Sequence, residues 1–217
     1  MKKTTLALFA LLVFGIGVQA QKSAAILRGG VNLANVSNND DGGYDDNRML
    51  TSFQVGVIGD LNITEFLAIQ PGILYTGKGI KWENNTQKLQ LNPRYIEVPV
   101  NLVFKTPTGA AKFFVGAGPY VAMGVGGKFK ADGLLNFEEN IQFSDDDPLT
   151  SEEEGAGAFI MRRFDYGLNG TVGIEASNLV ISANYGLGLA KLQSGSNSSN
   201  DQNNKHRVLS FTLGFKF

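Results

Sequence analysis

The chain has 217 residues, a formal net charge of −1 and no cysteine, which excludes a disulfide framework as the source of its stability. Its 27 glycines make up about 12% of the chain against a usual ~7%, and this excess argues against a helical protein because glycine inside a helix is costly. The charged residues form no basic patch of the kind that binds nucleic acid, so no nucleic-acid partner is expected.

Residues 1–20 have the three parts of a secretory signal peptide. Residues 2–3 are both lysine, residues 6–18 are apolar, and residues 18–20 form a small-x-small cleavage site. An apolar run of 13 residues is shorter than the ~20 that a membrane helix needs. A buried N-terminal helix is the alternative, but it does not explain why the basic start and the cleavage site occur together. We therefore expect export, and a single mature domain over 21–217.

Eight segments alternate between large apolar residues and small or polar residues, and this period of two predicts strands. The segments are 24–35, 50–60, 66–77, 94–105, 112–125, 162–176, 178–190 and 206–217. Each is about as long as the 9–11 residues that a tilted membrane strand needs, whereas strands of soluble proteins most often have about 5–6. The length of the segments therefore favours strands that cross a membrane.

The connections between these segments alternate between short and long. Short turns lie around 62–64, 106–111 and 176–178, whereas 78–93 and 126–161 read as long loops. In outer-membrane barrels the short turns face the periplasm and the long loops face outside. The sequence therefore predicts an all-β fold, an eight-stranded antiparallel up-and-down transmembrane β-barrel with an architecture like that of OmpA or OmpX.

A sheet in hydrocarbon must close, because every backbone N–H and C=O needs a partner there. We expect the last segment to pair with the first near Leu27, Gly29 and Val31. The small and polar face suits the crowded interior of an eight-stranded barrel, whereas a lipocalin-like soluble barrel would carry more Lys and Glu outside. The apolar face should contact lipid, with aromatic girdles near the strand ends. The girdle candidates are Tyr75, Phe104, Phe113, Phe164, Phe215 and Phe217.

Charged residues inside the predicted strands fall on the polar face, which is expected to line the lumen. They are Arg28, Glu97, Asp165 and Glu175, with Arg163 and Lys112 as further candidates. A conduction path or a catalytic path is the alternative to a structural network of ion pairs. We favour the structural network, because eight strands leave little open lumen and buried charges are normally paired.

His206 is the only histidine and shares the lumen face with Ser210. The two lie four residues apart on one strand, about 13 Å at ~3.3 Å per residue, so they cannot form a nucleophile and base pair. We therefore predict a protein that is not an enzyme, with no catalytic residue, no cofactor and no metal site. The stretch NNDDGGYDD at 38–46 lacks the spaced ligands and the closing Glu of an EF-hand.

The long connection 127–161 is strongly acidic. It holds nine Asp or Glu residues and two Lys residues, a net charge of −7. A solvated surface loop is the simplest interpretation. The alternatives are a docking site for a basic partner protein, and divalent cations that bridge the loop to lipopolysaccharide.

Several stretches resemble the small outer-membrane β-barrel proteins common in Bacteroidetes, labelled porin-family or PorT-like. The stretches are LRGGVNLANV, YIEVPVNLVFK, FFVGAGPYVAMGV, FDYGLNGTVGIE, ANYGLGLAKL and the terminal Phe217. The resemblance implies a location in the outer membrane, contact with its lipid and lipopolysaccharide, and assembly by the barrel-assembly machinery. It also implies that Phe215 and Phe217 carry the assembly signal.

The role we expect is a non-enzymatic barrel that anchors extracellular loops for envelope integrity, adhesion or partner binding. A narrow porin-like channel for small solutes is one alternative. The resemblance implies a second alternative, a PorT-like accessory of protein secretion.

Overall fold

The computed structural model describes residues 23–37, 47–83, 88–107, 109–133, 136–143, 160–190 and 205–217. The predicted signal peptide and the stretch NNDDGGYDD lie outside these residues, as does much of the acidic connection. Within the described ranges, no helix is long and apolar enough to cross a membrane.

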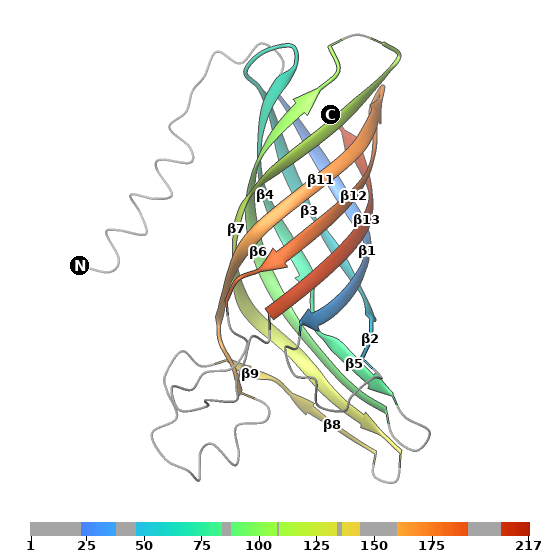
Figure 1. Ribbon diagram of the computed structural model, residues 1–217, viewed down its shortest axis with the longest axis vertical. Helices are drawn as coiled ribbons and strands as arrows, with labels where there is room; N and C mark the ends of the chain where they lie inside the picture. The colour runs from blue at the N-terminus through green and yellow to red at the C-terminus, as the bar shows by residue number, and fades with distance from the viewer. Residues whose placement is uncertain are drawn as a thin grey trace, which may run out of the picture.

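Among the described residues, eight long strands form one antiparallel ring (Figure 1). They are β1 (Ala24–Ser37), β3 (Leu50–Asn62), β4 (Leu67–Gly77), β6 (Lys88–Lys105), β7 (Ala111–Asp132), β11 (Phe164–Ala176), β12 (Leu179–Gly188) and β13 (Lys205–Lys216). Each strand pairs with the next, and β13 pairs with β1 to complete the ring. The prediction of an eight-stranded up-and-down barrel is confirmed.

The seam between β1 and β13 is continuous. Leu27 lies opposite Phe215, and Gly29 lies opposite Leu213. Past the end of β13, Phe217 exchanges two backbone hydrogen bonds of 3.0 and 2.9 Å with Ala25 of β1. The ring therefore leaves no free sheet edge in its wall, as a hydrocarbon surrounding requires.

The two faces of the wall alternate residue by residue. In β6 the side chains of Glu97 and Asn101 are buried, whereas those of Ile96, Val100 and Phe104 are 40%, 43% and 50% exposed. Large apolar side chains are exposed in the same way on all eight strands. A surface of this extent would be unfavourable in water but suits contact with lipid. The apolar face is therefore the outer face, as predicted.

Glycine lets neighbouring strands and side chains fill the interior closely. A Cβ atom at Gly118 would lie 1.9 Å from the carbonyl oxygen of Val100 and 2.7 Å from Cα of Asn101. Gly170, on the adjacent strand, has no other atom within 4 Å of the same position. Part of the high glycine content of the chain is therefore a requirement for close approach inside the barrel.

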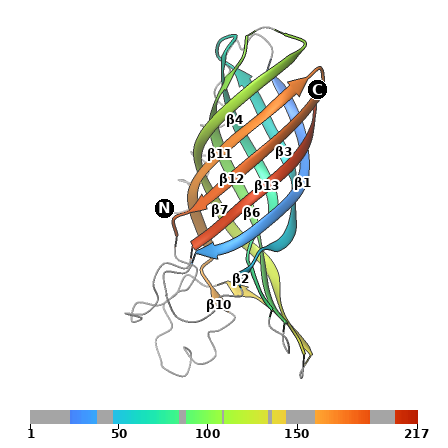
Figure 2. The same ribbon diagram turned by 45° about the vertical axis from the view of Figure 1, so that its right-hand side comes forward.

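The main departure from the predicted elements is an arm at the end of the barrel opposite the C-terminus (Figures 1 and 2). Strands β6 and β7 continue past the barrel. Strand β5 (Ile80–Glu83) pairs with β6 and with β2 (Asn47–Arg48), while β8 (Phe137–Asn140) pairs with β7. At the tip of the barrel, β9 (Gln142–Phe143) pairs in parallel with β10 (Ile160–Met161).

The arm corrects the interpretation of two connections as loops. Parts of 78–93 and 126–161 are strands rather than loops. The register of β6 shifts between Arg94 and Tyr95, so the alternation of the barrel strand does not run on unbroken into the arm. The sequence pattern therefore placed the start of the predicted strand at residue 94, whereas in the structure β6 begins at Lys88 and has a bulge at Arg94.

We expect Gly118→Ala to lower the free energy of unfolding by about 1–3 kcal/mol, because the added methyl group meets the backbone of β6. The matched control is Gly170→Ala, where a Cβ has open space. The measurement is urea-induced unfolding in lipid vesicles, followed by the mobility of unboiled protein on a gel. Equal stability of the two variants would contradict the close approach.

Candidate functional site

The interior of the barrel holds an ion cluster on the side of the arm. Lys78 Nζ lies 2.8 Å from Glu97 Oε2 and 2.8 Å from Asp165 Oδ2. Tyr120 donates its hydroxyl to Asp165 Oδ2 at 3.1 Å, and Lys78 Nζ lies 4.2 Å from the centroid of the Tyr120 ring. Because Lys78 is only 2% exposed, it depends on these partners to remain charged inside the protein.

A small polar cavity lies beside this cluster. Arg28, Glu97 and Asn101 are among the residues that line it, and its volume is about 30 Å³. Arg28 Nη1 donates to Asn184 Oδ1 at 3.3 Å, whereas Arg28 Nε and Asn101 Oδ1 have no partner among the described residues. A water molecule needs roughly 10–15 Å³ of such space, so the cavity has room for two or three waters but is too small to form a pore.

A second ion cluster lies in the half of the barrel nearer the C-terminus. Asp60 is fully buried and accepts hydrogen bonds from Lys105 Nζ at 2.6 Å and from Lys216 Nζ at 2.8 Å. Lys216 Nζ also lies 2.5 Å from Glu175 Oε1, and Gln70 Nε2 donates to Asp60 Oδ1 at 3.0 Å. Four strands contribute the charged residues, so the cluster ties opposite walls of the barrel together.

The other end of the interior is filled by apolar side chains. Val36, Ile80, Ile141 and Met161 are buried together, with Trp82, Leu91 and Phe143 packed against them. The ring of Phe143 meets the ring of Tyr95 edge to face, with centroids 5.7 Å apart. From the arm inward, the described interior therefore includes an apolar plug, the Lys78 cluster with its cavity, and the Asp60 cluster, with further buried apolar side chains such as Leu74, Val103 and Phe114.

His206 belongs to this filled interior. Its ring is 1% exposed, and Nε2 lies 3.3 Å from the hydroxyl oxygen of Tyr95. Ser210 lies on the same face of β13, four residues further along the strand. Among the described residues, no group of three or more His, Cys, Asp or Glu could hold a metal ion.

The four predicted lumen charges are distributed over both clusters. Glu97 and Asp165 lie in the Lys78 cluster, Arg28 lines the cavity beside it, and Glu175 lies in the separate Asp60 cluster. Lys112 is half-buried and lies opposite Glu175 on the neighbouring strand.

Arg163 is not a lumen residue. It is exposed, and its Nη2 donates to the carbonyl oxygen of Phe143 at 3.0 Å. Arg163 directly precedes β11, which begins at Phe164. The alternation of lumen-facing and lipid-facing residues holds only within the strand, so it does not predict the direction of the Arg163 side chain.

Sequence reasoning missed most of the partners of these charges. Lys78, Asp60 and Lys216 all lie at or just beyond the ends of the predicted strands. Extending the period of two to the ends would have placed Asp60 and Lys216 on the lumen face. Lys78 follows the predicted segment 66–77 directly, so it read as the first residue of a loop.

Comparisons with known proteins give one family match. A family model described as "Outer membrane protein beta-barrel domain" matches residues 19–194. No curated protein matches the chain.

Several solved structures are similar in shape. Ail, the attachment invasion locus protein of Yersinia pestis, is 15% identical with a TM-score of 0.45, over 91% of this chain and 100% of that chain. The outer membrane protein OprG from Pseudomonas aeruginosa is 11% identical with a TM-score of 0.46, over 90% and 95%. The outer membrane enzyme PagL is 11% identical with a TM-score of 0.46, over 88% and 98%. A fold does not determine a function, so the function must be argued from the residues of this chain.

We expect Lys78→Met to lower the free energy of unfolding by about 3–5 kcal/mol, because Glu97 and Asp165 would stay buried without their cation. The control is Lys81→Met in the arm. Lys81 pairs with Glu83 at 2.7 Å near solvent, and its loss should cost at most about 1 kcal/mol. Equilibrium unfolding in urea measures both values. A cost below 1 kcal/mol for Lys78→Met would contradict a central role of this cluster.

Proposed function

The chain belongs to the outer membrane protein β-barrel domain family, and we propose that it is a non-enzymatic, non-conducting anchor in the outer membrane. Its barrel would hold the arm and the long loops outside the cell for envelope integrity, adhesion or partner binding. Short turns face the periplasm in such barrels, and this rule supports an orientation with the C-terminus in the periplasm and the arm outside the cell. The observation that carries the proposal is the filled interior.

The filled interior supports an anchor over a channel. An ion crossing the barrel would have to separate Lys78 from Glu97 and Asp165, and then Lys105 and Lys216 from Asp60. Separating such a buried pair leaves charges without compensation, at a cost of several kcal/mol. The cavity beside the Lys78 cluster has space only for a few waters.

The position of His206 supports a protein without lipid-hydrolysing activity. The imidazole is buried in the interior and contacts Tyr95, so it cannot meet a lipid at the outer wall. A general base must come within hydrogen-bond reach of the group that it activates. We infer that His206 is part of the packing of the plug region.

The arm supplies the surface that the anchor would present. Lys128 and Lys130 both form ion pairs with Glu138, and hydrogen bonds from these two lysines lower the pKa of Glu138 to about 2. Glu138 is therefore charged at any physiological pH, and the arm carries a mixed-charge surface. The acidic residues 145–154 lie outside the described residues, and a basic partner or a divalent cation at them remains part of this proposal.

We expect purified protein in planar bilayers to give no single-channel current at either polarity. Insertion into lipid would be checked by protease protection of the same protein preparation in vesicles, and a porin reconstituted in parallel would be the positive control. Discrete current steps from the inserted wild-type protein would contradict a closed anchor.

The absence of cysteine from the chain allows a direct test of orientation. We expect Glu139→Cys, on exposed strand β8, to react with a membrane-impermeant maleimide on intact cells. Glu65→Cys, in the exposed turn before β4, should react only after the outer membrane is opened. The reverse pattern would contradict the placement of the arm outside the cell.

A further inference from the structure

The outer wall changes character where the barrel meets the arm. Phe53 and Tyr75 lie on adjacent strands with ring centroids 6.0 Å apart. The guanidinium of Arg94 lies 5.5 Å from the Phe53 ring and 6.0 Å from the Tyr75 ring, and its Nη1 donates to the Tyr75 hydroxyl at 3.2 Å. An arginine that lies over aromatic rings at the edge of an apolar wall is positioned for the boundary between lipid and water.

Two lysines of the arm, Lys128 and Lys130, extend the positive charge of Arg94 along the outer face. Arg94 lies opposite Gly126 in the sheet, and Lys128 is two residues further along the same strand. Such diagonal neighbours lie about 7–8 Å apart, within reach of one phosphate group. Lys128 and Lys130 have side chains 52% and 46% exposed, and both pair with Glu138. Three cations and one carboxylate give this set of residues a net charge of +2; we call it the Arg94 patch.

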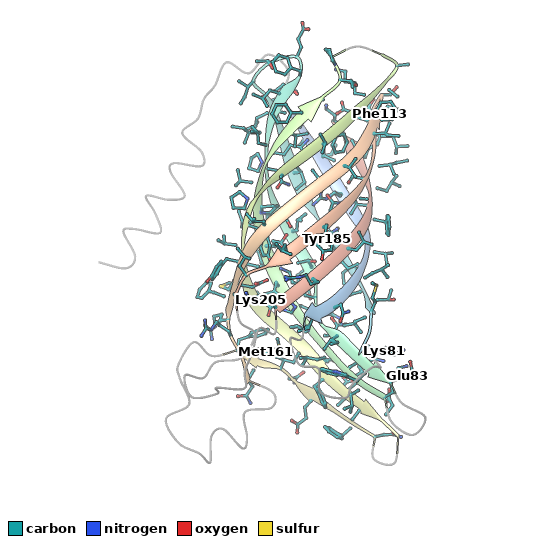
Figure 3. The ribbon with its side chains drawn as sticks, viewed as in Figure 1. Lys81, Glu83, Phe113, Met161, Tyr185 and Lys205 are labelled. Carbon is teal, nitrogen blue, oxygen red and sulfur yellow. The ribbon has the colours of Figure 1, made fainter. Side chains whose placement is uncertain are left out.

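The opposite end of the wall is arranged differently. The described lysines there are Lys105, Lys112 and Lys216, and all three lie on the lumen-facing positions of their strands. Lys105 and Lys216 are held by Asp60. The outer face at that end finishes in exposed aromatic residues instead, namely Phe104, Phe113, Phe215 and Phe217 (Figure 3 labels Phe113). At the arm end, by contrast, Arg94 lies on the outer face over aromatic rings.

We propose that the Arg94 patch binds the phosphate groups of lipid A, the phosphorylated glycolipid of lipopolysaccharide, in the outer leaflet. The wall below the patch offers exposed Val55 and Val57 to the acyl chains, and Phe53 with Tyr75 to the interface. Arg94 and Lys128 would then lie at the depth of the lipid A phosphate groups. Charge-assisted hydrogen bonds from these cations to phosphate oxygens are strong, and arginine can form two of them to one phosphate.

A lipid fits this surface better than a protein. The patch is continuous with the exposed apolar wall of β3, β4 and β6, so a protein bound to it would have to lie in the membrane as well. Lipid A combines acyl chains and phosphate groups in one molecule, and the wall and the patch offer a surface for each. The assignment to the outer leaflet rests on the proposed function, in which the arm lies outside the cell. The binding of phosphate groups by the patch does not depend on that orientation.

The test is titration of detergent-solubilised protein with bisphosphorylated lipid A, followed by native mass spectrometry. We expect Arg94→Gln to weaken the apparent affinity about tenfold, because it removes a charged donor set. Arg207→Gln is the matched control: Arg207 is an arginine on β13, four strands away around the ring, and its Nη1 donates to the carbonyl oxygen of Gly188 at 2.9 Å. The control should change the affinity less than twofold.

Two control lipids test whether the phosphate groups and the rest of lipid A both contribute to binding. One is dephosphorylated lipid A, and the other is phosphatidylglycerol. Both should bind at least tenfold more weakly than bisphosphorylated lipid A. If Arg94→Gln does not fold, the double variant Lys128→Gln with Lys130→Gln, on the exposed arm, replaces it with the same expectation.

Equal loss in Arg94→Gln and Arg207→Gln would overturn a localised site, and so would equal binding of the three lipids or no binding. Because micelles have no inner and outer leaflet, these results do not depend on orientation. Failure of the titration therefore overturns the lipid site alone, while maleimide labelling of Glu65→Cys on intact cells would overturn the orientation alone.

Discussion

The constraint on which the rest of the structure depends is the pairing of every backbone N–H and C=O in a wall surrounded by lipid. The pairing of β13 with β1 satisfies it by closing the ring. Closure with eight strands fixes a narrow interior, and a narrow interior must be filled or hydrated. Glycine at positions such as Gly118 and the two ion clusters around Lys78 and Asp60 are consequences of that requirement.

The filled interior moves the question of function to the outer surfaces. Buried ion pairs contribute little net stability compared with apolar packing, but removal of one partner is costly. The clusters therefore fix which strands face each other: Lys105 on β6 and Lys216 on β13 share the carboxylates of β3 and β11. Strands tied together in this way suit a barrel that anchors the arm.

The fold could be predicted from the sequence because the period of two is a direct result of alternation between lipid and lumen. In β13, Phe211 and Leu213 are exposed, whereas Ser210 and Thr212, which directly precede them, are buried. The arm could not be predicted in this way, because the pairing of β6 with β7 shifts register at Arg94, where these two strands pass from the barrel into the arm. Glu175 pairs with Lys216, whereas Glu97 pairs with Lys78 in the other cluster. Which charges meet depends on the stagger of the strands around the barrel, and no local sequence pattern gives that stagger.

The most direct test of a closed barrel is a disulfide across the seam. Gly29 lies opposite Leu213, a Cβ at Gly29 has its nearest atom at 3.9 Å, and the chain has no other cysteine. Opposite residues in antiparallel strands have Cα atoms about 4.5–5.5 Å apart, which is within the range of a disulfide. The closed barrel predicts that Gly29→Cys with Leu213→Cys forms an intramolecular disulfide in the outer membrane, seen as faster migration of boiled, unreduced protein. Unlinked protein, or disulfide-linked dimers alone, would contradict it.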